Sequence, residues 1–267
     1  MAKETVKKET FCMPTIKIYQ GDNLPILRSL PDKKFNLIVI DPPFNTKKVQ
    51  SSHHGSYKDK FDDFIDWIKP RIEEAKRLLT DDGSFFIHMD YREIHYVKVL
   101  CDKIFGREKF KNEIIWAYDY GGRPKTKWPC KHDNILWYVK DLKKYTYNYD
   151  AIDRIPYMAP GLVGAEKAKR GKTPTDVWWN TIVPTNGKER LGYPTQKPMA
   201  IIERIVKVHS NPGEHLLDFF AGSGTLGEAG AMHGRNVTLV DENPDAVAIM
   251  KKRLDGYGTL QMQTFHP

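Results

Sequence analysis

The sequence predicts an α/β fold with a doubly wound, mostly parallel sheet. The run FNLIVID (35–41) is continuously apolar up to its last residue, which is typical of a strand covered on both faces. Apolar residues at helical spacing fill 62–79, and a glycine-rich turn at 218–227 separates a strand-like run from a helix-like one. Strands that alternate with helices in this way indicate helices on both faces of a parallel sheet.

The same alternation places elements along both ends of the chain. In the first part we expect strands at 15–22, 35–41 and 84–90 and helices at 23–30, 62–79 and 92–106. In the last part we expect strands at 214–218 and 236–243 and helices that begin after the glycine turn and at Pro244. Pro70 falls inside the helix at 62–79 and is expected to kink or restart it.

Residues from about 118 to 190 interrupt this alternation. They are rich in Lys, Arg, Tyr, Trp, Gly and Pro and show no regular period, so we interpret them as an inserted segment. The expected organisation is one half of an α/β domain at 1–117, the insertion at 118–190, and the other half of the same domain at 191–267.

Composition restricts the class of protein. With 267 residues, 40% of them hydrophobic, the chain is long enough to bury a core. A net charge of +8 favours an acidic partner such as nucleic acid, although a generally basic surface gives the same composition. Cys12, Cys101 and Cys130 lack CxxC spacing, which argues against a disulfide framework and fits a reducing compartment. No apolar stretch approaches membrane-spanning length and residues 1–10 lack that of a signal peptide, so we expect a cytoplasmic protein.

The glycine-rich turn matches the pattern G-x-G-x-x-G through Gly222, Gly224 and Gly227. Such a turn brings the backbone close to a ligand and exposes the N–H groups at the start of a helix. Asp241, at the end of the next strand, is placed to accept hydrogen bonds from both hydroxyls of a ribose. These features favour nucleoside binding over a purely structural turn, and a dinucleotide-dependent oxidoreductase stays open at this point.

The tetrapeptide Asp41-Pro42-Pro43-Phe44 ends a strand at the edge where open α/β sheets bind ligands. The prolines hold the turn rigid and leave their carbonyls as acceptors. Asp41 adds a carboxylate and Phe44 a flat apolar face, so together they suit a planar ring that carries an amino group. Acceptors on the amino hydrogens would localise the nitrogen lone pair for attack on an electrophile. The alternative is an ordinary turn at a strand end.

DPPF and DFFAGSGT together resemble the amino-methyltransferases of DNA, which methylate adenine N6 or cytosine N4 with S-adenosylmethionine. The catalytic motif precedes the glycine motif, which is similar to the circularly permuted β class of that family and implies its Rossmann-like methyltransferase fold. The resemblance covers most of 15–255. It implies catalysis by Asp41, Pro42, Pro43 and Phe44, where Phe44 replaces the more frequent Tyr but keeps the stacking face, and Asp41 rather than Ser favours adenine.

The resemblance also assigns residues to S-adenosylmethionine. YQGD (19–22) is similar to the segment whose acid meets the cofactor's adenine, and GYPTQKP (192–198) to the segment near its methionine end. The aromatic Phe220 suits a sulfonium, and Asp218 is expected to meet the cofactor's amino group or to order the turn. The implied cofactor residues are Asp22, Thr195, Lys197, Asp218, Phe220, Gly222, Gly224, Thr225 and Asp241.

A base inside a duplex cannot reach such a pocket, so the resemblance implies that the target is rotated out of the stack. Basic side chains interleaved with aromatic ones in the inserted segment suit contacts with the DNA backbone. The expected DNA contacts are Arg123, Lys125, Lys127, Lys131, Lys169 and Arg170, with a solvated basic loop as the alternative. Residues 46–60 are expected to form a mobile loop that orders when DNA binds.

The sequence therefore predicts a site-specific methyltransferase that acts on adenine N6 in duplex DNA. Cytosine N4 is the alternative within the family and RNA a further possible substrate, whereas an oxidoreductase would leave DPPF without a role. No metal is expected, because the adjacent His53 and His54 have no nearby Cys or acid partner and methyl transfer of this kind needs none. The resemblance allows a homodimer, and a cognate restriction endonuclease as a functional partner.

Overall fold

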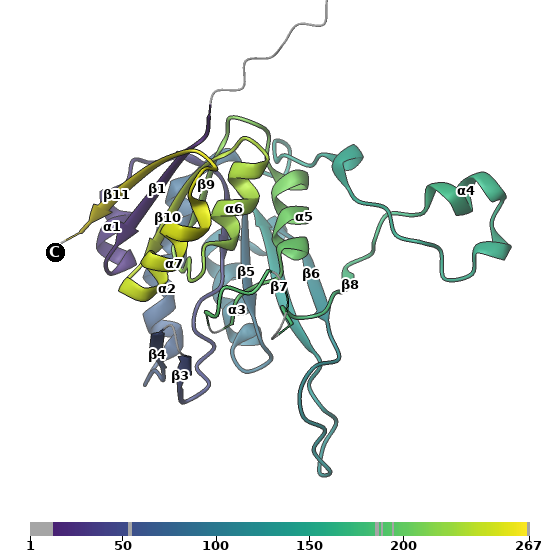
Figure 1. Ribbon diagram of the computed structural model, residues 1–267, viewed down its shortest axis with the longest axis horizontal. Helices are drawn as coiled ribbons and strands as arrows, with labels where there is room; N and C mark the ends of the chain where they lie inside the picture. Colours follow the sequence, from purple (N-terminus) through teal and green to yellow (C-terminus); the bar gives the residue numbers. More distant parts are fainter. Residues whose placement is uncertain (1–12, 53–54, 185–186, 188, 194, 266–267) are drawn as a thin grey trace, which may run out of the picture.

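A nine-stranded sheet lies at the centre of the structure (Figure 1). This computed structural model describes residues 13–52, 55–184, 187, 189–193 and 195–265. Residues 1–10, in which no signal peptide is expected, and the pair His53 and His54 lie outside the described residues. Within these ranges, no helix is both long and apolar enough to cross a lipid bilayer.

The order of the strands is β11-β1-β10-β9-β2-β5-β7-β6-β8. Their bounds are β1 Thr15–Gln20, β2 Phe35–Ile40, β5 Leu79–Met89, β6 Phe110–Ala117, β7 His132–Val139, β8 Val177–Trp179, β9 His215–Asp218, β10 Asn236–Asp241 and β11 Thr259–Thr264. All neighbouring pairs are parallel except those of β7, which runs antiparallel to β5 and β6. The predicted mostly parallel α/β sheet is confirmed.

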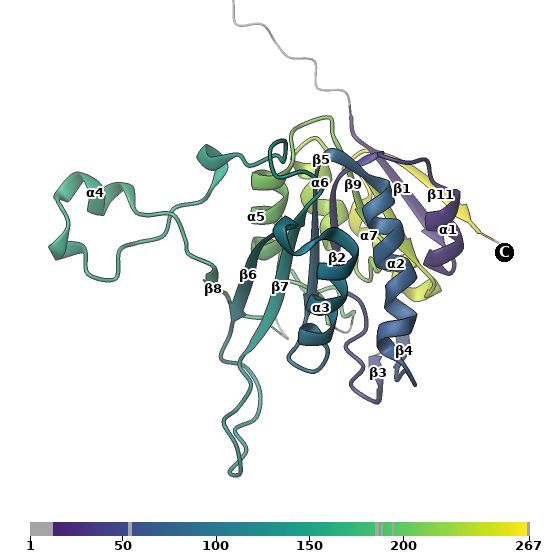
Figure 2. The same cartoon turned by 180° about the vertical axis from the view of Figure 1, so that it is seen from behind.

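Helices cover both faces of this sheet (Figures 1 and 2). One face carries α5 Met199–His209, α6 Thr225–Met232 and α7 Pro244–Leu254, and the other carries α1 Asn23–Ser29, α2 Phe64–Leu78 and α3 Ile94–Phe105. An apolar core fills the space between each helical layer and the sheet. The short helices are α4 Ala165–Arg170 and the 3-10 turns η1 Arg107–Lys109, η2 Tyr149–Ala151 and η3 Pro160–Leu162.

Three segments differ from expectation. Helix α2 is continuous through Pro70 and does not restart there, because burial of its apolar face offsets the loss of one backbone hydrogen bond; the expected kink stays a prediction. Residues 46–60 contain a regular hairpin, β3 Lys48–Ser52 paired with β4 Gly55–Asp59, in place of the expected loop. The segment 118–190 contains β7, whose last seven residues are buried in the middle of the sheet. β7 is thus a strand of the main sheet although it lies within the segment interpreted as an insertion. The division of the chain at 117 and 190 stays a prediction.

The order of strands explains how the chain brings its two motifs together. β9 and β10, from the last part of the sequence, lie between β1 and β2 from the first part. Since β10, β9 and β2 are adjacent and parallel, their carboxyl ends meet at one edge of the sheet. The loop at 118–131 and the β3–β4 hairpin project from this same end of the molecule, and the segment that carries α4 projects sideways (Figures 1 and 2).

Candidate active site

A cavity of about 330 Å³ lies at the carboxyl ends of these central strands. Its lining includes ten of the residues implied by the sequence: Asp22, Asp41, Pro43, Thr195, Lys197, Asp218, Phe220, Gly222, Thr225 and Asp241. Pro42, Phe44 and Gly224 of the same set lie next to lining residues in the chain without lining the cavity themselves. The structure thus brings the residues of both motifs to one place.

Three aspartates end three neighbouring strands at this cavity: Asp41 follows β2, Asp218 ends β9 and Asp241 ends β10. Asp218 accepts a hydrogen bond at 2.9 Å from the backbone N–H two residues later, which orders the start of the glycine turn. Asp241 accepts from Gly222 N–H at 2.8 Å and from the N–H two residues later at 2.9 Å. Burial raises the pKa of Asp241 to about 6, and that of Asp218 well above its ordinary value, despite these bonds.

Glycine is required at two positions of the turn for different reasons. Gly224 caps α6 with φ +77°, a left-handed conformation, and a Cβ there would lie 2.8 Å from Met250 Cγ. Gly227 lies inside α6, where a Cβ would lie 2.7 Å from Leu239 Cδ1 on β10. The first glycine shapes the turn and the second allows helix and strand to pack closely, as in nucleoside-binding turns.

Asp41 is held from two sides. Its Oδ1 lies 2.7 Å from His88 Nδ1 and its Oδ2 lies 2.5 Å from Lys197 Nζ. Burial alone would raise the pKa of Asp41, but Lys197 and His88 outweigh it and hold this pKa below its ordinary value. The Phe44 ring lies beside both partners, with its centroid 5.3 Å from Lys197 Nζ and 5.2 Å from the His88 ring. Asp41 is therefore ionised and acts only as an acceptor.

His88, Asp133 and Tyr118 are polar residues of this region that the sequence analysis did not single out. His88, near the end of β5, is buried, and its Nε2 lies 3.3 Å from Asp133 Oδ2 on β7. Tyr118 donates a hydrogen bond to Asp133 Oδ1 at 3.0 Å. A signal for His88 was present, because it follows an apolar run on a strand that ends at the same edge as β2. Asp133 gave no such signal, since β7 runs the other way and was not recognised as a strand.

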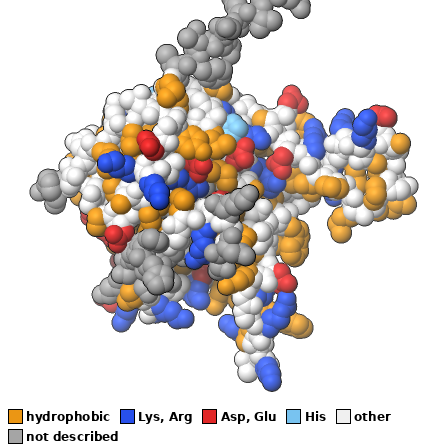
Figure 3. Space-filling model, viewed as in Figure 1, with side chains coloured by type: hydrophobic (Ala, Val, Ile, Leu, Met, Phe, Trp, Pro, Cys, Tyr) orange, Lys and Arg blue, Asp and Glu red, His pale blue; other side chains and the backbone are white. Residues whose placement is uncertain are grey.

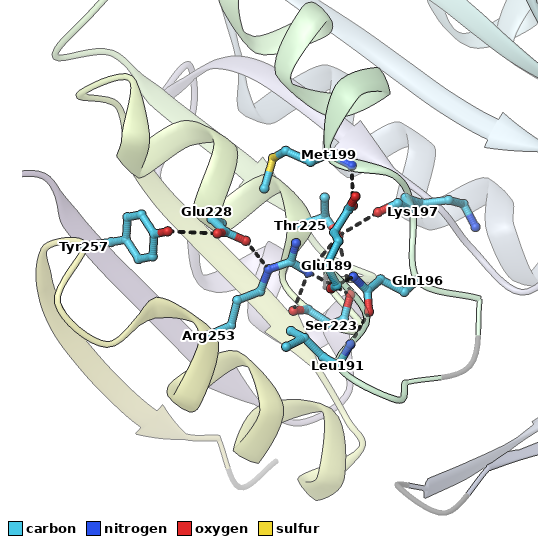
Figure 4. Close-up of polar contacts among 10 residues, drawn as sticks. All are labelled: Glu189, Leu191, Gln196, Lys197, Met199, Ser223, Thr225, Glu228, Arg253 and Tyr257. Atoms are coloured by element: carbon cyan, nitrogen blue, oxygen red, sulfur yellow. Dashed lines mark hydrogen bonds and ion pairs between the residues drawn. The ribbon is translucent and has the colours of Figure 1, made fainter. Parts of the chain in front are cut away.

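The segment that carries Lys197 is tied to the glycine turn (Figure 4). Thr225 donates to the Lys197 carbonyl at 3.3 Å and accepts from Arg253 Nη1 at 3.0 Å. The buried Arg253 forms an ion pair with Glu228 at 2.5 Å, and Tyr257 donates to the same carboxylate at 2.9 Å. Thr225, predicted from the resemblance to meet the cofactor, thus also connects the turn to the lysine segment.

Aromatic side chains line the side of the cavity near Asp22. The Trp67 ring lies 5.7 Å from Phe220 and 4.3 Å from Phe61. The Arg71 guanidinium lies 4.3 Å from the Trp67 ring and 3.2 Å from Asp22 Oδ1. A flat apolar wall beside an acceptor suits a planar, amino-bearing ring.

These features fit S-adenosylmethionine. Its sulfonium and ammonium groups are cations, and they would stabilise the ionised forms of Asp218 and Asp241, whose pKa values are raised by burial. Its ribose hydroxyls would donate to Asp241, and its adenine would lie against Trp67 near Asp22, whereas Phe220 was expected at the sulfonium and also lies beside Trp67. The charged and aromatic side chains that line the cavity therefore suit this cofactor.

The six predicted DNA contacts do not line the cavity. Lys and Arg side chains gather on both projections of the molecule (Figure 3). Arg123, Lys125, Lys127 and Lys131 belong to the loop at 118–131, and Lys169 and Arg170 to α4. Arg123 forms an exposed ion pair with Asp119 at 2.7 Å, and Lys131 Nζ donates to two backbone carbonyls of its own loop. The structure does not bring the two groups together, because the projections point in different directions (Figures 1 and 2).

Curated relatives of this chain are DNA methyltransferases. The DNA adenine methyltransferase YhdJ of Escherichia coli (strain K12) is 33% identical over 251 residues, which cover 89% of this chain and 82% of that protein. The type II methyltransferase M.HpaI of Haemophilus parainfluenzae is 32% identical over 231 residues, which cover 86% of this chain and 71% of that protein.

Solved structures of the same fold include the cytosine-N4-specific PvuII DNA methyltransferase, with a TM-score of 0.68, 18% identity and coverage of 91% of this chain and 87% of that one. The M1.HpyAVI complex with S-adenosylmethionine has a TM-score of 0.60, 25% identity and coverage of 90% and 99%. The family model described as DNA methylase matches residues 35–252. S-adenosylmethionine is the methyl donor of this family, so the cofactor prediction is confirmed. This chain belongs to the DNA methylases that modify the amino groups of adenine N6 or cytosine N4.

Proposed function

We propose that this protein methylates the N6 amino group of adenine in duplex DNA, with the target base rotated out of the stack. The observation that carries the proposal is the position of Asp41. Its ionised carboxylate lines the same cavity as Asp218 and Asp241, the aspartates that end β9 and β10. Asp rather than Ser at this position favours adenine, and the relative YhdJ, 33% identical, is named as an adenine enzyme.

The proposed chemistry assigns one task to each part of the site. Asp41 and the Pro42 carbonyl accept the amino hydrogens, Phe44 stacks on the base, and the nitrogen lone pair is thereby localised. S-adenosylmethionine supplies an electrophilic methyl group, whose bond to sulfur breaks as the bond to nitrogen forms. The amino nitrogen becomes acidic only as the methyl group arrives, so Asp41 need not be a strong base to take its proton and pass it to solvent.

DNA would be held by the two basic projections and by the surface between them. Arg123, Lys125, Lys127 and Lys131, in the loop between β6 and β7, would contact one set of phosphates, and Lys169 and Arg170 of α4 would contact another set along the duplex. We further propose that the protein acts at a specific DNA sequence in the cytoplasm. It would do so as a homodimer, together with a cognate restriction endonuclease as its functional partner. Light scattering of the purified protein tests the homodimer, and disruption of the gene alone in its host would be lethal if the endonuclease exists.

Identification of the methylated nucleoside tests the proposal. The protein is incubated with S-adenosylmethionine and unmethylated genomic DNA, which is then digested to nucleosides and analysed by mass spectrometry. We expect N6-methyldeoxyadenosine. N4-methyldeoxycytidine would instead establish cytosine N4 as the target. Preferential transfer to an RNA competitor would contradict the proposal that duplex DNA is the substrate.

A further inference from the structure

His88 is placed to act on Asp41 through direct contact. It lies on β5, the strand next to β2, and is only 6% exposed. Its Nδ1 lies 2.7 Å from Asp41 Oδ1, and its ring meets Phe44 edge-on at 5.2 Å. One buried side chain thus touches both the carboxylate and the aromatic residue of the predicted catalytic tetrapeptide.

Both nitrogens of His88 face carboxylate oxygens. Nδ1 faces Asp41, and Nε2 lies 3.3 Å from Asp133 Oδ2, within ion-pair distance although without good hydrogen-bond geometry. Tyr118 fixes Asp133 from the far side at 3.0 Å. A neutral imidazole has one donor and one acceptor nitrogen, so this arrangement is satisfied best when both nitrogens carry a proton.

The two groups that hold Asp41 differ in how they are anchored. Lys197 reaches Oδ2 from a flexible side chain on the irregular segment before α5, whereas His88 reaches Oδ1 from a strand in the sheet. Its ring is packed between Phe44 and Trp116, with centroids 5.2 and 5.5 Å away. Hence His88 is the more rigid of the two partners. By holding Oδ1, it orients the carboxylate so that Oδ2 faces Lys197.

We propose that His88 is a positioning residue for Asp41, and that Asp133 holds the imidazolium in the orientation that fixes the carboxylate. The proposal rests on the proposed role of Asp41 in methyl transfer. Two carboxylates, one imidazolium and the Lys197 ammonium form a largely buried group of zero net charge, in which Asp41 stays partly exposed to the cavity, and this lowers the cost of keeping Asp41 ionised. Without His88, Asp41 would keep only Lys197 as a partner, so its carboxylate would be less firmly oriented and its pKa would rise.

The charged groups around His88 define its expected pH response. Asp41 follows β2, Asp133 lies on β7, and Lys197 faces Asp41 from the segment before α5. Tyr118 and Asp90 lie behind Asp133, and Asp218 faces Asp41 from β9. Burial lowers the pKa of His88, but Asp41 and Asp133 outweigh burial and Lys197, so the pKa is raised. Activity should therefore fall on the alkaline side as His88 loses its proton.

Three variants separate positioning from mere packing. His88→Ala removes both contacts, His88→Asn keeps a neutral donor close to the position of Nδ1, and Asp133→Asn keeps the shape of the far partner without its charge. His209→Asn is the matched control, because His209 is equally buried but neutral, with its pKa lowered by burial to about 3. Each variant is assayed for kcat against pH on unmethylated genomic DNA and for S-adenosylmethionine affinity by calorimetry.

We expect kcat to fall at least about tenfold in His88→Ala, with partial recovery in His88→Asn and cofactor affinity within about threefold of the wild type. Asp133→Asn should shift the alkaline limb to lower pH, and His209→Asn should leave the profile in place. Wild-type kcat in His88→Ala, or an unshifted profile in Asp133→Asn, would overturn the proposal.

An NMR titration of the His88 imidazole separates this proposal from the proposed function. We expect His88 to be protonated at neutral pH in the wild type and less basic in Asp133→Asn. A neutral His88 at pH 7 would overturn the positioning role even if the protein methylates DNA. A protonated His88 in a protein that methylates no DNA would support the electrostatic arrangement and contradict the proposed function alone.

Discussion

At the scale of single residues, the site depends on carboxylates whose charge is controlled in two different ways. Asp41 is ionised because His88 and Lys197 lie at its two oxygens. Among the described residues, Asp218 and Asp241 accept hydrogen bonds from backbone N–H groups alone, and burial raises their pKa values. Asp41 is therefore a permanent acceptor for an amino group. Asp218 and Asp241 become fully ionised when a cationic ligand binds beside them.

Replacement of Asp41 tests its role as a permanent acceptor. Asp41→Asn keeps the shape but puts donor hydrogens where the target amine needs an acceptor, so kcat should fall by about a hundredfold or more. The affinity for S-adenosylmethionine, measured by calorimetry, should change little, because Asp41 is assigned to the target amine rather than to the cofactor. Asp255→Asn, an exposed carboxylate after α7, is the control and should keep full activity. Near wild-type transfer by Asp41→Asn would contradict the mechanism.

The pKa of Asp241, about 6, predicts a pH-dependent cofactor affinity. Hydroxyl donors of the ribose favour the ionised carboxylate, so below pH 6 binding must first release a proton. Affinity for S-adenosylmethionine should therefore decrease from pH 7 to pH 5, by at most about tenfold per pH unit below the pKa. Calorimetry across this range measures the decrease, and Asp241→Asn should bind weakly without this pH dependence. An affinity that rises towards pH 5 would contradict the assignment.

At the scale of elements, the loop between β6 and β7 is the basic projection that extends from the end of the sheet where β2, β9 and β10 end (Figures 1 and 2). It carries exposed lysines at 125 and 127 and an almost fully exposed Trp128. Charged side chains on such a loop contribute little to folding. Their expected contribution is to DNA affinity, which a change of salt concentration reveals.

Lys125→Ala combined with Lys127→Ala should weaken DNA binding and reduce the slope of log affinity against log salt by about 1 for each phosphate that the loop no longer neutralises. Cofactor affinity and thermal stability should be unchanged. Lys251→Ala combined with Lys252→Ala removes the same charge from exposed positions on α7 and serves as the control. If both double variants lower the slope equally, the effect is one of net charge and the loop has no specific role.

At the scale of the whole molecule, the sheet should require its C-terminal strands. A chain that ends at residue 212 lacks β9 and β10, which separate β1 from β2, so we expect no cooperative unfolding transition. A chain that ends at residue 257 lacks only the edge strand β11 and should keep a cooperative transition at a lower temperature. Thermal unfolding followed by circular dichroism distinguishes the two. Cooperative unfolding of the shorter chain would contradict this dependence.

The sequence predicted most of this architecture because its strands and helices alternate with clear periods. The strands that carry Asp41, Asp218 and Asp241 are buried on both faces, so their apolar runs were unambiguous, and parallel order placed their ends together. The structure confirms the α/β fold and the order of its elements. The roles of the individual site residues stay predictions, although most of them line one cavity.

Two features could not be predicted because they depend on neighbours distant in the chain. β7 begins with polar residues within a lysine- and tyrosine-rich segment, and only its place between β5 and β6 shows why it is a strand. The contact of Lys197 with Asp41 joins residues separated by most of the sequence. Local period predicts a strand, but the partner of a side chain depends on the order of strands in the sheet.

That order has a consequence for synthesis on the ribosome. β1 and β2 emerge early but are never neighbours, and the two strands that fill the gap between them, β9 and β10, are made only after residue 214. In the nascent polypeptide, the edges of β1 and β2 that face this gap must therefore stay unpaired until β9 and β10 have been translated. A premature stop codon would release no half-working enzyme, only a fragment for proteases to clear.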